Sequence, residues 1–319
     1  MRNDYLAQLY DLARDDKNIF ALVADNGAIV YDKYRKDFGD RFINFGISEA
    51  NMISVAAGLA SCGKIPFTYT ISCFLTMRAF EQVRNDVCLQ KMNVKLVGIG
   101  GGFVYSNLGP THHATEDIAL MRVLPNMTIF SPADGLEARK VTSAAAAIDG
   151  PVFIRLATGS GPVVYTQDYD FQVGKGVILH EGEDVAIIAT GGIVHEVLKA
   201  VDELERRGIS PLLINMPTIK PIDKEIIIQA ASSTGAILTV EEHSIIGGLG
   251  SAVAEVISEE SSNKVMFKRM GLEGVFPSGY GSYQDMKEMN GLSSRHIVEE
   301  TENLYRDKKK GKIKDLIEG

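Results

Sequence analysis

The stretch FINFGISEANMISVAAG, residues 42–58, decides the predicted fold. It carries a single carboxylate, Glu49, among small, apolar or uncharged residues, and Gly46 and Ser48 come just before it. This pattern predicts a strand that ends in a turn and leads into a helix. Glu49 then lies in the first helical turn, where the helix dipole favours a negative charge. Such an acid is more often only a first-turn or capping residue, so the rest of the chain has to decide its role.

Composition excludes several classes of protein. A net charge of −8 and the lack of a concentrated basic face argue against a nucleic-acid partner. No apolar run reaches the roughly 18 residues that a membrane span needs. The three cysteines, Cys62, Cys73 and Cys88, have no CxxC spacing and indicate reduced thiols rather than a disulfide framework or a zinc site. We therefore expect a cytoplasmic protein with neither a nucleic-acid nor a membrane partner.

Apolar runs alternate with helical patterns along the chain, which predicts an α/β protein with parallel sheets flanked by helices. The predicted strands are Ile19–Ala24, Arg41–Phe45, Ile65–Tyr69, Val94–Ile99, Met127–Phe130, Val152–Leu156, Val185–Ala189, Pro211–Asn215, Ala236–Glu241 and Val265–Arg269. Polar, turn-rich sequence from Thr158 to Gly176 interrupts this rhythm. We therefore expect one domain over residues 1–165, a linker over residues 166–182, and a smaller α/β domain over residues 183–319.

Ligands of open parallel sheets bind beyond the carboxyl ends of the strands. Four segments follow predicted strands there: Asp25-Asn26-Gly27, the Glu49 turn, the loop at Ser72–Phe74, and the long loop GGGFVYSNLGPTHH, residues 100–113. The last loop contains the neighbouring histidines His112 and His113, which point in different directions if they start a helix. By itself such a pair more often caps or packs than catalyses. The chain has no GxGxxG, Walker, GxSxG or HExxH motif and no metal-ligand spacing, so we expect no metal held by this chain alone.

Several longer motifs, in order, resemble the C-terminal half of transketolase, and especially the small subunit of the enzymes that are split in two. The motifs are DRFINFGISEANM at 40–52, ISCFLTMRAFEQVRND at 71–86, GPTHHATEDIALMRVLPNM at 109–127, SPADGLEA at 131–138 and VEEHSIIGGLGSAVAE at 240–255. The resemblance covers essentially the whole chain. The same superfamily includes the β chains of 2-oxoacid dehydrogenases and the deoxyxylulose-phosphate synthases. The two domains then correspond to a pyrimidine-binding domain and a transketolase C-terminal domain.

The resemblance implies thiamine diphosphate as the cofactor. Glu49 matches the glutamate that hydrogen-bonds the aminopyrimidine ring and assists acid–base catalysis through it. Phe74 matches the aromatic residue that packs on the pyrimidine. Asp25 lies where the family places an acid beside the cofactor, and Arg78 matches a position that faces the substrate channel next to the cofactor.

The resemblance also implies substrate contacts. His112 matches the histidine near the reacting carbonyl and hydroxyl groups, and His113 is its neighbour. Arg155 resembles a residue that pairs with a sugar phosphate. Two positions depart from the family: Leu108 stands where transketolases have an aspartate, and Gly100 aligns with a family histidine. A phosphate-binding serine also has no counterpart after Asp25, so we expect a donor or acceptor that differs from the usual pentose phosphates.

The family binds the diphosphate through Mg²⁺ on a GDG…N motif in another domain, and this chain lacks that motif. The resemblance therefore implies that Mg²⁺ (or Ca²⁺) is bound mainly by a second polypeptide, the N-terminal subunit, in an α2β2 assembly. The predicted activity is transfer of a two-carbon ketol unit between sugars. The alternatives are the E1 β subunit of a 2-oxoacid or acetoin dehydrogenase, a deoxyxylulose-phosphate-synthase-like ligase, and a scaffold subunit without catalytic activity.

Overall fold

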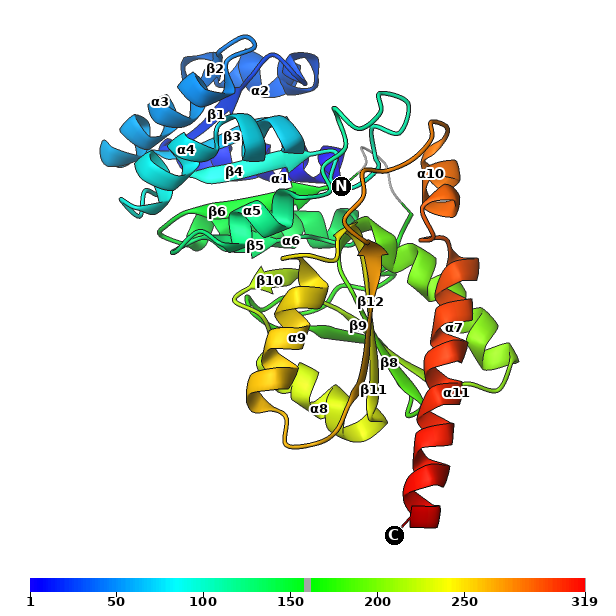
Figure 1. The fold of residues 1–319 in the computed structure, drawn as a ribbon. Helices are drawn as coiled ribbons and strands as arrows, with labels where there is room; N and C mark the ends of the chain where they lie inside the picture. The colour runs from blue at the N-terminus through cyan, green and yellow to red at the C-terminus, as the bar shows by residue number, and fades with distance from the viewer. Residues whose placement is uncertain (158–161, 319) are drawn as a thin grey trace.

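The computed structural model describes residues 1–157 and 162–318, and it contains two sheets (Figure 1). The first sheet has the order β10-β5-β6-β4-β3-β1-β2. Its strands in that order are β10 (Thr218–Lys220), β5 (Thr128–Phe130), β6 (Val152–Leu156), β4 (Lys95–Ile99), β3 (Ile65–Ile71), β1 (Ile19–Val23) and β2 (Phe42–Asn44). All pair in parallel except β10, which is antiparallel to β5.

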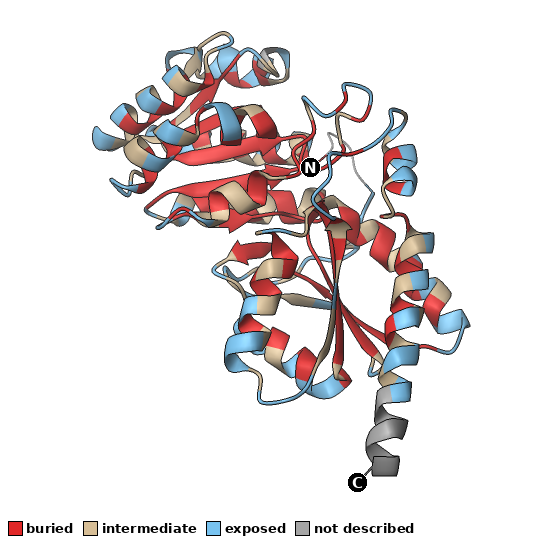
Figure 2. Cartoon of the chain, viewed as in Figure 1, coloured by how far each residue is buried: buried red, intermediate tan, exposed pale blue. Residues whose placement is uncertain are grey.

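The second sheet has the order β12-β11-β8-β9-β7. Its strands in that order are β12 (Met266–Leu272), β11 (Ala236–Ser244), β8 (Val185–Ala189), β9 (Pro211–Asn215) and β7 (Val177–His180), and only β7 is antiparallel. In both sheets the apolar central strands are buried on both faces, as Figure 2 shows by their red colour. The α/β class and the two-domain organisation are confirmed.

Helices cover both faces of each sheet. In the first domain, α1 and α6 pack on one face, and α3 and α5 on the other. In the second domain, α8 and α9 pack on one face, and α7 and α11 on the other. The helices are α1 (Arg2–Asp15), α2 (Asp32–Asp37), α3 (Glu49–Ser61), α4 (Phe80–Gln82), α5 (Asp117–Arg122), α6 (Gly135–Ala147), α7 (Val194–Arg206), α8 (Lys224–Thr234), α9 (Leu249–Glu260), α10 (Tyr283–Met289) and α11 (Ser294–Glu318), with 3₁₀ turns η1 (Ala28–Tyr31), η2 (Gly39–Arg41) and η5 (Gly191–Ile193).

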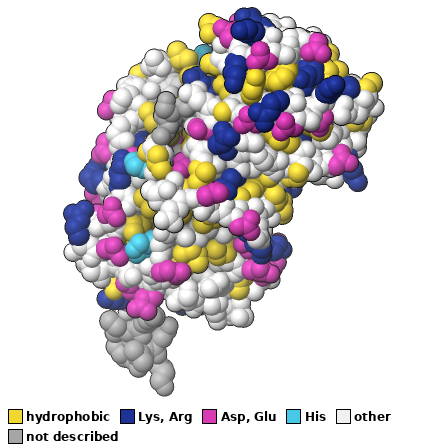
Figure 3. Space-filling view, turned by 180° about the vertical axis from the view of Figure 1, so that it is seen from behind, with side chains coloured by type: hydrophobic (Ala, Val, Ile, Leu, Met, Phe, Trp, Pro, Cys, Tyr) yellow, Lys and Arg dark blue, Asp and Glu magenta, His cyan; other side chains and the backbone are white. Residues whose placement is uncertain are grey.

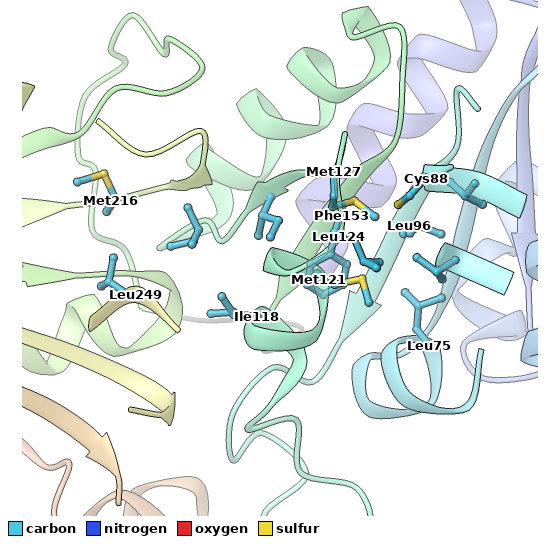
Figure 4. Close-up of a cluster of buried hydrophobic side chains, with 14 of the residues drawn as sticks. Leu75, Cys88, Leu96, Ile118, Met121, Leu124, Met127, Phe153, Met216 and Leu249 are labelled. Atoms are coloured by element: carbon cyan, nitrogen blue, oxygen red, sulfur yellow. The ribbon is translucent and has the colours of Figure 1, made fainter. Parts of the chain in front are cut away.

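The two domains share one apolar core. A cluster of buried side chains runs from Leu75 and Leu96 in the first domain through Ile118 to Met216 and Leu249 in the second (Figure 4). Burial of such side chains stabilises the fold by roughly 1.5–3 kcal/mol each. The domains are therefore held together by packing, and the second domain can act on loops of the first.

Every predicted strand is present, but three predicted features differ from the structure. Residues 166–182, expected as a linker, contain β7. This strand is too short to show the alternating apolar and polar pattern that would predict it from the sequence. β10 lies beyond the linker and yet joins the first sheet. The pattern over Met77–Leu89 predicts a helix, and the structure is helical there, but most of its turns are π-helical: the segments η3 (Phe74–Arg78) and η4 (Val83–Cys88) lie on either side of the short α4. The residues 158–161, expected in the turn-rich stretch, lie outside the described part of the chain.

Lys95 is a buried lysine at the start of β4. Its Nζ donates to the carbonyls of Ile148, at 2.6 Å, and Gly150, at 2.9 Å, just after α6. Desolvation by burial lowers the pKa of Lys95 to about 7, whereas an unfolded lysine titrates near 10.4. Between these values the unfolded chain binds more protons than the folded chain. The free energy of unfolding therefore rises with pH in this window, by at most about 1.4 kcal/mol per pH unit from this group.

We expect Lys95→Met to flatten this pH dependence. The measurement is urea denaturation of the wild-type and variant chains at several values between about pH 7 and about pH 9, because unfolded tyrosines titrate only near pH 10. The cysteines titrate in both proteins. The difference between the two slopes of unfolding free energy against pH therefore reports on Lys95 alone. Parallel slopes would show that Lys95 stays charged in the folded chain.

Candidate active site

Four loops meet at one edge of the first sheet. Strands β4, β3, β1 and β2 are neighbours and run in parallel, so their carboxyl ends share that edge. The segments that follow them are the predicted ones: the turn at Asp25, the N-terminus of α3, the η3 segment and the loop from Gly100. The topology alone therefore explains why residues far apart in the sequence come together.

Glu49 is the first residue of α3 and is 2% exposed. Its N-cap residue, Ser48, makes no side-chain capping bond, so the carboxylate lies against the uncapped positive end of the helix. One oxygen, Oε2, accepts a hydrogen bond from Arg78 Nη1 at 2.9 Å, and Arg78 is half exposed. The other oxygen has no hydrogen-bond partner among the described residues.

A row of side chains leads from Glu49 to His112. The guanidinium carbon of Arg78 lies 4.5 Å from the centre of the Phe74 ring, and the Phe74 ring lies 5.2 Å from the His112 ring in an edge-to-face arrangement. Phe74 and Arg78 are the two ends of the π-helical segment η3, and such wide turns are frequent at functional sites. The structure thus brings together four predicted residues, which we call the Glu49 row: Glu49, Arg78, Phe74 and His112.

Tyr105 borders this row and was not predicted. Gly100 has φ +86°, and a Cβ there would overlap the Tyr105 ring, which packs directly on the glycine. The same ring lies 6.4 Å from His112. Burial raises the pKa of Tyr105, and a side-chain hydrogen bond from Asn26 partly offsets this. Tyr105 therefore packs over Gly100, the position that aligns with a histidine of the family.

The remaining predicted residues of the loops lie outside the Glu49 row. His113 is 2% exposed, its ring lies 6.0 Å from Phe103, and neither ring nitrogen has a partner among the described residues. Burial lowers the pKa of His113, which makes it neutral at pH 7. Leu108 is 48% exposed on the loop surface. Asp25 is exposed at the end of β1, with its backbone N–H bonded to Asn44 Oδ1.

Arg155 lies in a buried network instead of facing the open side of the site. Its Nε donates to both oxygens of Asp117, at 3.0 and 2.9 Å, and its Nη2 donates to the carbonyls of Ala114 and Glu242. Asp117 also accepts a hydrogen bond from Ser72 Oγ at 2.7 Å. Arg155 is 4% exposed and Asp117 is fully buried. Through these bonds the guanidinium connects β6 to α5, to the backbone just after the 100–113 loop, and to β11.

The described residues show neither a metal cluster nor a membrane helix. No group of three or more His, Cys, Asp or Glu side chains in residues 1–157 and 162–318 is arranged to hold a metal ion. Among the same residues, no helix has both the length and the apolar composition to cross a membrane. On the face drawn in Figure 3, Lys and Arg side chains are interspersed with Asp and Glu.

Comparison with known families identifies both domains. Residues 1–162 match the transketolase pyrimidine-binding domain, and residues 174–297 match the transketolase C-terminal domain. The chain belongs to the transketolase family. The boundary between the two matches falls close to β7, which agrees with the place of the second sheet in the chain.

Several relatives of this transketolase-family chain align with it over nearly their whole length. A putative transketolase C-terminal section from Methanocaldococcus jannaschii is 41% identical and aligns over 93% of this chain and 94% of its own. A 6-deoxy-6-sulfo-D-fructose transketolase subunit from Clostridium sp. is 39% identical over 93% of this chain and 92% of its own. A solved split-gene transketolase, described as an inactive β4 tetramer, is 41% identical, covers 96% of this chain and 97% of its own, and superimposes with a TM-score of 0.86.

Proposed function

We propose that this chain is the small subunit of a two-component transketolase, which transfers a two-carbon ketol unit between sugars with thiamine diphosphate at the subunit interface. The observation that carries the proposal is the Glu49 row: a buried carboxylate at a helix start, beside an aromatic ring and a half-buried histidine. The similarity, over nearly their whole length, to a putative transketolase C-terminal section and to a transketolase subunit supports it.

The residues present fit the pyrimidine end of this cofactor. Glu49 has a free carboxylate oxygen that can accept a hydrogen bond from a nitrogen heterocycle, and the Phe74 ring offers an apolar face for packing against it. When bound, thiamine diphosphate supplies stabilisation of a carbanion, which the side chains of proteins cannot provide. Arg78 already forms an ion pair with Glu49 in the chain alone. When the pyrimidine ring binds, we expect this ion pair either to break or to remain while the carboxylate also binds the ring.

His112 is the residue that would exchange protons with substrate. Its Nδ1 lies 3.0 Å from Thr111 Oγ1, which orients the ring, and its Nε2 has no partner among the described residues. An imidazole held in this way can exchange a proton with a substrate oxygen. Tyr105 and Phe74 flank the ring and limit its rotation.

A second polypeptide would complete the site. The sequence lacks the GDG…N motif of the family, and residues 1–157 and 162–318 contain no group of three or more His, Cys, Asp or Glu side chains that could hold a metal ion. We therefore place the metal and the diphosphate mainly on an N-terminal transketolase subunit, in an α2β2 assembly. The solved split-gene relative is described as an inactive β4 tetramer, which fits a requirement for a partner.

The donor would differ from the common ketose phosphates. Leu108 is exposed on the loop that carries His112 and offers no polar contact to a donor hydroxyl. Arg155, the predicted phosphate partner, already donates its Nε and Nη2 hydrogens to protein groups. One relative acts on 6-deoxy-6-sulfofructose, so a sulfonate in place of the terminal phosphate belongs in the donor screen.

The test is a titration of thiamine diphosphate and Mg²⁺ into the chain alone and into the complex co-expressed with its candidate large subunit. We expect tight binding only in the complex, followed by ketol transfer in a screen of phosphorylated, sulfonated and unsubstituted ketoses. Tight binding by the isolated chain would overturn the two-subunit site. Binding in the complex without ketol transfer, but with CO₂ release from a 2-oxoacid, would assign the chain to a dehydrogenase instead.

A further inference from the structure

The loop that carries His112 is held from the second domain. Phe103, near the start of this loop, is fully buried inside the core of the second domain. The preceding Gly102 lies so close to β11 that a Cβ on it would come within 2.7 Å of the Glu242 Cβ. Just after the loop, the Thr115 carbonyl accepts a hydrogen bond from the Ser244 N–H at 2.7 Å. Both ends of the loop are therefore anchored to the second domain.

A third contact reaches the middle of the loop. Tyr280 lies in the connection between β12 and α10, and its ring rests on Gly109. A Cβ at Gly109 would lie 2.6 Å from Tyr280 Cε1 and 2.9 Å from its hydroxyl oxygen. Figure 1 shows the two connections side by side, the cyan-green loop of the first domain and the orange one of the second. Gly109 has φ +78°, so both its backbone conformation and the tyrosine exclude a larger residue there.

Gly109 is directly coupled to His112. The carbonyl of Gly109 accepts the His112 N–H at 2.9 Å, which makes these residues the two ends of one turn. The His112 ring packs against Phe74 on its other side. Any shift of Gly109 therefore moves the imidazole relative to Phe74, and Tyr280 is the second-domain residue that lies over this turn.

We propose that Tyr280 is a positioning residue, through which the second domain clamps the Gly109–His112 turn and keeps His112 at the Glu49 row. The catalytic consequence rests on the proposed function, but the clamp itself does not. Tyr280 is 69% exposed, so its truncation removes little buried area and leaves folding essentially unchanged. This property separates a positioning role from a structural one.

Hydrogen exchange on the isolated chain tests the clamp without any cofactor or activity. We expect Tyr280→Ala to accelerate exchange in peptides covering residues 103–113 several-fold, while the thermal midpoint stays within about 2 °C. Tyr280→Phe keeps the ring on Gly109 and should behave as wild type. The matched control is Phe276→Ala, which removes another exposed aromatic ring, 75% exposed, from the same connection. Unchanged exchange in Tyr280→Ala, or an equal effect in Phe276→Ala, would overturn the proposal.

Kinetics of the co-expressed complex test the consequence for His112. We expect Tyr280→Ala to lower kcat about tenfold or more with little change in KM, because misplacing a proton-transfer group affects the chemical step more than ground-state binding. Tyr280→Phe should restore kcat. An unchanged kcat beside an altered exchange rate would show a clamp that does not serve catalysis. If the wild-type complex transfers no ketol unit, the proposed function fails, and the exchange experiment still decides the clamp.

Discussion

Glu49→Gln should lower kcat of the assembled enzyme by roughly 10²–10⁴-fold, the range that a single acid–base group contributes. Glutamine keeps the shape of the side chain and still offers an oxygen to Arg78 Nη1, so the fold and the hydrogen bond from Arg78 are preserved. It loses the negative charge that the helix start and the guanidinium surround. The measurement is steady-state ketol transfer by the co-expressed complex, with thermal unfolding as a check on folding.

The control for this prediction is Glu81→Gln, which removes an exposed carboxylate from α4 at the same change in net charge. We expect its kcat to equal that of the wild type. A Glu49→Gln complex that retained more than about half of the wild-type turnover would mean that Glu49 only caps α3. The chain would then be a scaffold subunit, and the catalytic carboxylate would have to come from elsewhere in the assembly.

The position of Glu49 could be predicted because it depends on local pattern. The turn residues before it and the helix-compatible run after it predict the start of α3, and the helix begins at Glu49 itself. The convergence of the Asp25 turn, Phe74 and the 100–113 loop could also be predicted, since it follows from parallel strands whose carboxyl ends share an edge. Both depend on rules that act within a strand–helix unit.

Contacts between different strand–helix units could not be predicted from the sequence. Nothing in GGGFVYSNLGPTHH indicates that Tyr105 folds back over Gly100, because the contact depends on the left-handed conformation of that glycine. The π-helical winding of η3, which aligns Arg78 with Phe74, has no signature in composition. The role of the second domain could not be predicted either, since Phe103 packs in the core of that domain and Tyr280 contacts Gly109, about 170 residues earlier in the chain.

Arg155 shows how a family resemblance and a structure can assign different roles to one residue. The resemblance implies a partner for a sugar phosphate. In the folded chain its Nε is bonded to Asp117 and its Nη2 to two backbone carbonyls, all out of contact with solvent. To offer Nε or Nη2 to a ligand, this guanidinium would have to break buried hydrogen bonds, which is costly. We therefore expect Arg155 to stabilise the domain junction.

Arg155→Met should accordingly lower the free energy of unfolding by about 3–5 kcal/mol, the cost of leaving one member of a buried ion pair unpaired. Urea denaturation of the chain alone measures this, without cofactor or partner. The double variant Asp117→Asn with Arg155→Met should recover part of the loss, because it removes the unpaired charge and leaves Ser72 a partner in the amide. The opposite result would be an Arg155→Met chain that is as stable as the wild type and an assembled enzyme that shows only a raised KM for a phosphorylated donor. That result would show that Arg155 binds the substrate. In that case the guanidinium would have to leave Asp117 during the catalytic cycle, and the buried network would be a resting state of the site instead of a permanent junction between the domains.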